Sequence, residues 1–208
     1  TIYAKYRSGG LIGKVYADIY GWDVRDCTNY GTIYGVLRGD LGNKNIHEIG
    51  GCIGYIRSGV TFENLVNEGN IIIDRTLSEN TINKVLDIGG VVGIAYSSYV
   101  KDTTLLDCRN LGSIELWNTD SETSYLVSDI GGIAGKIEGG TNGNGPLIIS
   151  CVNQHEINLS NYDRNVSATV SNVGGIAGSQ IGFITECTNF GAISGSEGIG
   201  GIVGQFKP

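Results

Sequence analysis

The chain has 208 residues and a formal net charge of -7 at pH 7, and 40% of its residues are hydrophobic. No basic run interrupts this acidic balance, which argues against nucleic acid and against an anionic membrane surface as partners. The apolar content suffices for a folded core, and no apolar run approaches the length of a membrane span. We therefore expect an ordered chain with no direct membrane insertion. Glycine is the outlier, with 34 residues and no collagen-like period, which indicates many turns and close backbone contacts.

Two short motifs alternate along the chain. The first is Gly-Gly-apolar-apolar-Gly, and it begins at Gly9, Gly50, Gly89, Gly131, Gly174 and Gly200. The second has the pattern x-Cys-x-Asn-x-Gly-x-Ile, and it occupies residues 26–33, 64–71, 107–114, 150–157 and 186–193. Successive glycine blocks are 41, 39, 42, 43 and 26 residues apart, so the last repeat defines the shortest unit. Repeats of this length are typical of a solenoid.

The sequence predicts an all-β fold, namely a parallel β-solenoid (β-helix) of about five coils. Each coil is expected to hold three short strands, because the apolar runs are short, β-branched and bounded by turn residues. The longer coils should carry their insertions at one corner, between the terminal isoleucine and the next glycine block. Residues 1–208 then form a single domain, which we expect to be a fragment of a longer protein. The expected coils start near Gly9, Gly50, Gly89, Gly131 and Gly174, with a partial coil from Gly200.

Stacked coils place equivalent residues above one another, about 4.8 Å apart, so the repeat alignment becomes a set of columns. The cysteine position is filled by Cys27, Leu65, Cys108, Cys151 and Cys187. Exchange with leucine indicates a core position, and the rung spacing exceeds the roughly 3.8 Å that a disulfide needs between Cβ atoms. We therefore expect free thiols. A zinc site is disfavoured because a linear column cannot supply four converging ligands.

The asparagine position is filled in every coil, by Asn29, Asn67, Asn110, Asn153 and Asn189. A glycine follows two residues later, except in the fourth coil, where His155 stands instead. Asparagine and glycine tolerate positive φ and suit a tight corner, and stacked amides can hydrogen-bond from rung to rung. His155 is then expected at a strained or re-routed corner, with a functional histidine as the alternative reading.

An acidic residue recurs two positions before three of the glycine blocks, at Glu48, Asp87 and Asp129. Strand alternation is expected to place these side chains on one outward face, in adjacent rungs, where like charges repel. Either screening by solvent or a bound calcium ion would relieve this repulsion. Apart from this candidate cation column, the sequence indicates no metal site and no cofactor.

Catalytic motifs are incomplete. His47-Glu48 resembles the start of a zinc-protease motif, but Gly51 stands where the second histidine is required. Asp26, Asp107 and Glu186 directly precede cysteines of the column and should face outward. They fall on alternate rungs about 9.6 Å apart, near the upper limit for an inverting pair of carboxylates. A polysaccharide-active β-helix enzyme therefore stays open as an alternative, although we expect no catalytic residues.

The repeats resemble a known motif. Gly-Gly-Ile-Ala-Gly at 174–178, followed by Glu-Cys-Thr-Asn-Phe-Gly-Ala-Ile at 186–193, is similar to the GLUG motif, and the similarity covers nearly the whole chain in five copies. GLUG-motif repeat proteins include bacterial surface and adhesin-like proteins and the non-catalytic regions of IgA-specific metallopeptidases. The resemblance implies an extracellular location, at the cell surface or secreted, and it transfers no catalytic residue.

The function expected from these observations is a non-catalytic stalk or display scaffold that adheres to a glycan or protein of a host or cell surface. Flanking domains of the same chain are expected as further partners, and an accessory role in a secreted metallopeptidase is an alternative. Aromatic residues of the stacked insertions are good candidates for ligand contact, and packing of the insertions onto the solenoid is the alternative role. These candidates are Tyr34, Trp117, Tyr125 and Tyr162.

Overall fold

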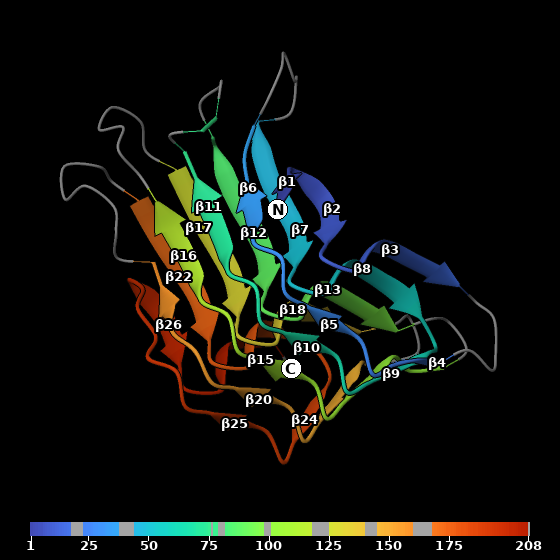
Figure 1. Cartoon of the computed structure of the whole chain (residues 1–208). Coiled ribbons are helices and arrows are strands. Elements are labelled where there is room, and N and C mark those ends of the chain that lie inside the picture. The colour runs from blue at the N-terminus through green and yellow to red at the C-terminus, as the bar shows by residue number, and fades with distance from the viewer. Residues whose placement is uncertain are drawn as a thin grey trace.

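The computed structural model describes residues 1–17, 23–37, 44–75, 77–78, 82–97, 101–117, 125–139, 145–159 and 168–207. These residues form 27 strands in five sheets, and every pairing between named strands is parallel. Each sheet takes one strand from each successive coil, so the chain is a parallel β-solenoid (Figure 1). The described residues contain no helix that is long and apolar enough to cross a membrane.

The five sheets are named A to E. Sheet A contains β1 (Ile2–Ala4), β6 (Ile33–Gly35), β11 (Ile71–Asp74), β16 (Ile114–Trp117) and β21 (Ile157–Asn158). Sheet B contains β2 (Tyr6–Gly9), β7 (Asn45–Gly50), β12 (Lys84–Gly89), β17 (Tyr125–Gly131), β22 (Ala168–Gly174) and β26 (Glu197–Gly200). Sheet C contains β3 (Ile12–Ala17), β8 (Ile53–Ser58), β13 (Val92–Ser97), β18 (Ala134–Glu138), β23 (Ala177–Gln180) and β27 (Val203–Phe206). Sheet D contains β4 (Asp23–Arg25), β9 (Thr61–Glu63), β14 (Thr104–Leu106), β19 (Leu147–Ile149) and β24 (Phe183–Thr185). Sheet E contains β5 (Thr28–Asn29), β10 (Val66–Asn67), β15 (Arg109–Asn110), β20 (Val152–Asn153) and β25 (Thr188–Asn189).

One coil holds five strands, in the sheet order B, C, D, E, A, so the expectation of three strands per coil is wrong. A sharp bend in the backbone divides a segment that the sequence pattern predicted as one strand into two shorter strands. In the second coil, Asn64 has a φ of 51° and separates β9 from the two-residue strand β10. A left-handed residue redirects the chain at once, so a short strand can follow it without any loop.

Coil length varies at two corners, which corrects the expectation of one. The corner between sheets A and B carries insertions in the first four coils, as expected. The corner between sheets C and D varies as well: two residues separate β23 from β24, whereas residues 139–146 separate β18 from β19. The stacked strands tolerate this because each insertion leaves the pairing register on both sides unchanged.

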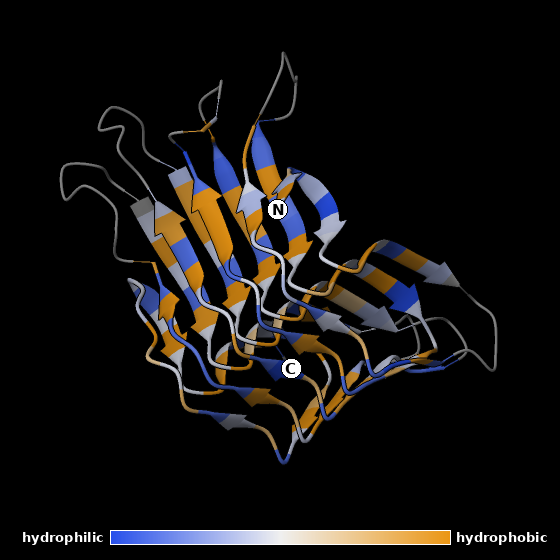
Figure 2. Ribbon diagram, viewed as in Figure 1, coloured by the Kyte–Doolittle hydropathy of each residue, from blue (hydrophilic) through white to orange (hydrophobic). Residues whose placement is uncertain are grey.

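The coil is bent into two arms, each with its own hydrophobic core (Figure 1). Sheets A and B enclose the first core, which is filled by branched residues such as Ile49, Ile88 and Ile130. Sheets C, D and E enclose the second core, which includes Phe62, Leu105 and most of the cysteine column. Bands of similar hydropathy run across the neighbouring strands in Figure 2, as expected when like residues stack. The place where the two arms join is called the elbow below.

Candidate functional site

The asparagine column lies at the elbow. The pairing of sheet E aligns Asn67 with Asn29 and Asn110, and continues through Asn153 to Asn189. The amide nitrogens of the first four asparagines each donate to the amide oxygen of the next rung at 2.8–2.9 Å. Each also donates to the backbone carbonyl two residues ahead, as Asn110 does to Gly112 at 2.8 Å. The buried amides therefore satisfy one another along the whole stack, which fixes the register of the coils.

The glycine blocks pack against this asparagine column. A Cβ atom on Gly90, the second glycine of its block, would lie 2.4 Å from Asn110 Cγ and 2.1 Å from the carbonyl oxygen of Gly132. The same contacts recur at Gly51, where the nearest atoms belong to Gly90 and Asn67. The two sequence motifs are thus the two sides of one elbow. Glycine is needed there because no side chain fits between two backbones and the amide.

The cysteine column runs beside the asparagine column. The structure stacks Cys27, Leu65, Cys108, Cys151 and Cys187 on successive rungs, and all five cysteines of the chain are free thiols. Their sulfurs donate to backbone carbonyls, as Cys108 does to Leu106 at 3.4 Å. Burial raises the pKa of Cys52, whereas the hydrogen bond from the Cys151 thiol lowers the pKa of Cys187. These contacts describe a packing position rather than a metal centre.

Two further columns have a left-handed backbone, which corrects the prediction of positive φ at the asparagine corner. Their φ values range from 47° to 61°. The inner column precedes the glycine blocks and consists of Arg7, Glu48, Asp87, Asp129, Asn172 and Gly198. The outer column precedes the cysteines and consists of Asp26, Asn64, Asp107, Ser150 and Glu186. Asn and Asp tolerate this conformation better than most residues, which explains their frequency in both columns.

His155 lies outside the left-handed region, so the predicted strained corner is not found there. Its side chain is exposed, and its carbonyl oxygen accepts the usual hydrogen bond from Asn153. Glycine two residues after the column asparagine is therefore explained by space and not by backbone conformation. A Cβ on Gly112 would lie 2.1 Å from the carbonyl oxygen of Gly69.

Each inner-column residue is a left-handed kink that recurs at the same place in neighbouring strands. Pairing between β12 and β17 joins Leu86 to Ser128 and Ile88 to Ile130, and it omits the left-handed residue between them. The kink breaks strict alternation, so Val85 and Ile88 both point into the first core although they are three residues apart. The acids of this column are therefore buried or half-buried, which corrects the expectation of an outward face.

The inner column meets the first residues of sheet C across the elbow. A Cβ on Gly93 would lie 2.6 Å from the backbone of Glu48, so the sheets touch there. Glu48 is only 9% exposed, and it forms an ion pair with Arg7 in which Arg7 Nε lies 2.7 Å from Glu48 Oε2. Burial opposes its ionisation, but hydrogen bonds from His47 and Arg7 hold the pKa of Glu48 below its ordinary value.

Asp87 differs from Glu48 in the charges around it, which include Asp129 and Lys136. Burial raises the pKa of Asp87 to about 7, the Asp129 carboxylate adds to the rise, and Lys136 opposes it. Asp129 accepts a 2.9 Å hydrogen bond from Asn172. The repulsion in this column is thus lessened by the hydrogen bond to Asp129 and by the raised pKa of Asp87, which favours its protonated form. Among the described residues, no three His, Cys, Asp or Glu side chains are grouped to hold a metal ion.

The aromatic candidates do not form one face. Tyr34 on sheet A stacks on Tyr3, with ring centroids 5.6 Å apart, and Trp117 is 40% exposed two rungs away. Tyr125 is only 4% exposed, and its ring lies in the first core with Arg75 4.5 Å above it, so its expected role in ligand contact is wrong. Tyr162 falls outside the described residues.

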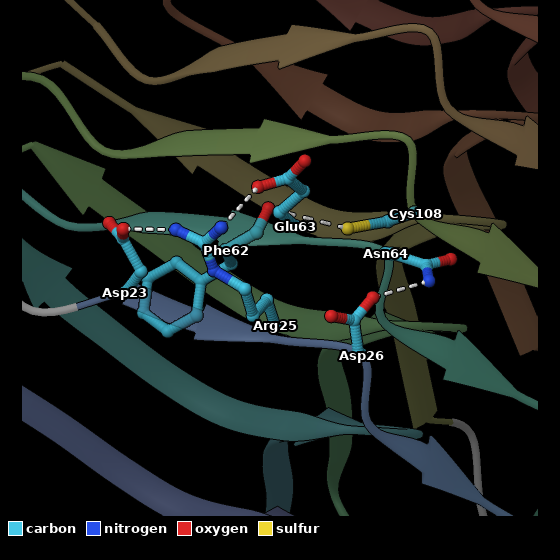
Figure 3. A network of polar contacts seen from close by, with 7 residues as sticks. All are labelled: Asp23, Arg25, Asp26, Phe62, Glu63, Asn64 and Cys108. Carbon is cyan, nitrogen blue, oxygen red and sulfur yellow. Dashed lines mark hydrogen bonds and ion pairs between the residues drawn. The ribbon is translucent and has the colours of Figure 1, made fainter.

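The outward carboxylates lie where they were expected. Asp26, Asp107 and Glu186 are exposed on alternate rungs. Asp26 accepts a hydrogen bond from Asn64 at 2.8 Å, close to the Asp23–Arg25–Glu63 cluster of sheet D (Figure 3). Glu186 accepts a hydrogen bond from Ser150 at 3.0 Å. Each of these two carboxylates thus has an ordinary polar partner on the neighbouring rung.

Sequence reasoning missed a cluster of rings and cations on sheet C. These residues stand one and three positions after the glycine blocks: Lys14, Tyr16, Tyr55, Arg57 and Tyr96. Aligning the repeats beyond the glycine motif would have found them, because the register of sheet C stacks these two positions from β3 to β18.

In comparisons with known proteins, no family model, no curated protein and no solved structure matches the chain.

Proposed function

We propose that this chain is a non-catalytic extracellular repeat module, a stiff scaffold that displays a binding face for a glycan or protein of a cell surface. The observation that carries the proposal is the unbroken asparagine column, which hydrogen-bonds all five rungs into one body. A rod of this kind transmits position and force with little bending, as a stalk requires. The resemblance of the repeats to GLUG-motif proteins supports the surface location and the adhesive role.

The proposed arrangement suits a longer chain in which flanking domains are held apart by the solenoid. A repeat array contacts mainly its nearest neighbours, so coils can be added or removed without redesigning the core. The insertions at two corners change the surface while the stacked strands keep their register. Binding specificity can thus vary on a constant scaffold.

A glycan array and a panel of surface proteins, probed with the purified chain, test this function. We expect reproducible binding to at least one glycan or protein class and no release of sugar fragments. A polysaccharide-degradation screen serves as the opposing test, with Asp107→Asn as the diagnostic variant. Degradation that this substitution abolishes would overturn the proposal in favour of a carbohydrate-active enzyme.

A further inference from the structure

Two of the aromatic candidates share the outer face of sheet A, whose strands lie side by side in Figure 1. The residues at alternate positions, such as Ile71 and Ile73, point into the first core, so the residues between them face outward. Trp117 lies two residues beyond Glu115 on β16 and therefore points the same way. The outward residues of the first four rungs are called the aromatic face below: Tyr3, Tyr34, Ile72, Glu115 and Trp117.

Neighbouring side chains hold the rings of this face in place. Trp117 Nε1 donates to Glu115 Oε2 at 2.8 Å, and Glu115 Oε1 accepts a hydrogen bond from the Ser113 hydroxyl. The Tyr34 ring stacks on the Tyr3 ring with an interplanar angle of 26°. A side chain that is fixed before binding loses little conformational entropy when a ligand contacts it. The second and fourth rungs therefore carry preorganised aromatic rings.

The two ring positions are too far apart for a small ligand to contact both. Tyr34 and Trp117 are separated by two strand spacings across the sheet and by two residues along the strands, which together amount to about 12 Å. Ile72 lies on the rung between them and is only 5% exposed, so the surface between the rings is closely packed. Trp117 is 40% exposed and offers the larger contact area. A ligand that contacts both rings has to be an oligomer.

The charges around the aromatic face favour an uncharged ligand. The strands of sheet A contain two acids, Asp74 and Glu115, and no lysine or arginine. The charged side chains that directly flank these strands are Lys5, Arg75 and Glu156, so acids outnumber cations by three to two. An anion therefore finds no excess of positive charge here.

A cationic ligand finds no ready partner on this face either. Asp74 is only 3% exposed, and both oxygens of Glu115 already accept hydrogen bonds that hold Ser113 and Trp117. Displacing those bonds would release the indole that forms the contact surface. The phenol of Tyr34, in contrast, can both donate to and accept from the hydroxyl groups of a ligand. Aromatic faces with polar tips suit a ligand that has apolar faces and hydroxyl edges.

We propose that the aromatic face binds an uncharged oligosaccharide, with one sugar ring stacked on Trp117 and a second sugar in contact with Tyr34. This inference rests on the proposed adhesive function and names its ligand class. The C–H groups of a sugar ring form an apolar face that packs on an aromatic ring, while its hydroxyl groups stay hydrated or bond to the phenol. Glu115 is a positioning residue, because it orients the indole without touching the sugar.

Calorimetric titration of the full chain with size-matched ligands tests the inference. The probes are cellohexaose, chitohexaose, maltohexaose, a sulfated heparin-derived hexasaccharide and an oligolysine peptide. We expect at least one uncharged hexasaccharide to bind, with little change in affinity as salt rises. Its monosaccharide should bind about tenfold more weakly or worse, because one sugar cannot reach both rings. The sulfated sugar and the peptide should bind far more weakly than the uncharged hexasaccharide.

Substitutions on the aromatic face separate stacking from positioning. Trp117→Ala should weaken binding about tenfold or more, and Tyr34→Ala about two- to fivefold. Trp117→Phe keeps a smaller ring and should lose less than the alanine variant. Glu115→Ala releases the indole and should weaken binding about two- to fivefold. Glu115→Gln keeps an acceptor for Trp117 Nε1, so it should restore most of the affinity.

A ring on another sheet controls for general effects of removing an exposed aromatic residue. Tyr16→Ala removes a ring that is 57% exposed on sheet C, and this variant should bind like the parent chain. Uncharged-sugar binding that is equally strong in the Trp117→Ala variant would overturn the aromatic face while leaving the adhesive function intact. Binding only to the sulfated sugar, the peptide or proteins would overturn the ligand class. No binding to any surface component would overturn the adhesive function as well.

Discussion

The asparagine column and the cysteine column run side by side through the same five rungs, yet they obey different rules. Asparagine occupies its position in every coil, whereas Leu65 replaces cysteine in the second coil without breaking the stack. The amides bond to one another at 2.8–2.9 Å, while the thiols donate mostly to nearby backbone carbonyls at 3.2–3.6 Å.

The difference shows which property each position demands. A buried amide must find partners for both its oxygen and its nitrogen, and in this stack the partner is the identical residue on the next rung. A buried thiol needs only a cavity of suitable volume. Chemical identity therefore specifies the asparagine column, and side-chain volume specifies the cysteine column.

The largest effect should come from filling the space beside the asparagine column. Gly90→Ala would place a Cβ 2.1 Å from a backbone carbonyl and against Asn110, so we expect a loss of more than about 4 kcal/mol or failure to fold. Gly201→Ala is the matched control, because no atom lies within 4 Å of the position that its new methyl group would take. Urea unfolding monitored by circular dichroism compares the two variants. Similar losses of unfolding free energy in both would contradict the packing described for the elbow.

Breaking one amide rung should cost nearly as much. Asn110→Ala removes the partner of one N–H of the buried Asn67 amide and the donor to the buried Asn153 amide oxygen, so we expect a loss of about 3 kcal/mol in unfolding free energy. Cys108→Ala on the same rung should cost about 1 kcal/mol, since only volume is lost. Equal losses at the two positions would erase the distinction between the columns.

A third column, of acids, sharpens the comparison because its members carry charge. The pKa of Asp87 is raised from its ordinary value to about 7, so between pH 4 and pH 7 the unfolded chain releases a proton that the folded chain retains. Its contribution to stability is complete below about pH 4 and is lost as pH rises to 7. Asp87→Asn should therefore gain about 2 kcal/mol over the parent chain at pH 8 and nothing at pH 4. A gain independent of pH would show that Asp87 does not titrate in this range.

The smallest effect concerns the reactivity of the thiols. Brief treatment with a maleimide at neutral pH should label the half-buried Cys27 and Cys187 and spare Cys52, Cys108 and Cys151 until the chain unfolds. Cys187 should react faster than Cys27, because the hydrogen bond from Cys151 lowers the pKa of Cys187. Peptide mass spectrometry reads the sites. Any pair of cysteines found linked before labelling would contradict a packing role for the column.

Much of the fold could be predicted from the sequence, because the two motifs repeat in register and stacking follows from repetition. The parallel solenoid and the positions of the asparagine and cysteine columns came from that alignment alone. The five strands per coil did not, since a bend at a single left-handed residue such as Asn64 has no strong sequence signal. Left-handed kinks at Glu48 and Asp87 likewise disturb the alternation on which strand reasoning depends.

The candidate site was less accessible to prediction than the fold. Tyr125 was assigned to an insertion that offers a binding face, but it is the first residue of β17 and points into the first core. The rings of Tyr16, Tyr55 and Tyr96 lie in different coils, and only the register of sheet C brings them together with Lys14 and Arg57. Such a surface depends on neighbours from several rungs, so no single repeat displays it.

Nuclear magnetic resonance of the asparagine side chains tests the central claim most directly. In a sample with labelled asparagine, we predict contacts between the amide groups of Asn29 and Asn67, Asn67 and Asn110, Asn110 and Asn153, and Asn153 and Asn189, with slow exchange of the bonded protons. Contacts that skip a rung should be absent. Rapid exchange of all five side-chain amides, with no contact between neighbours, would contradict the stacked solenoid.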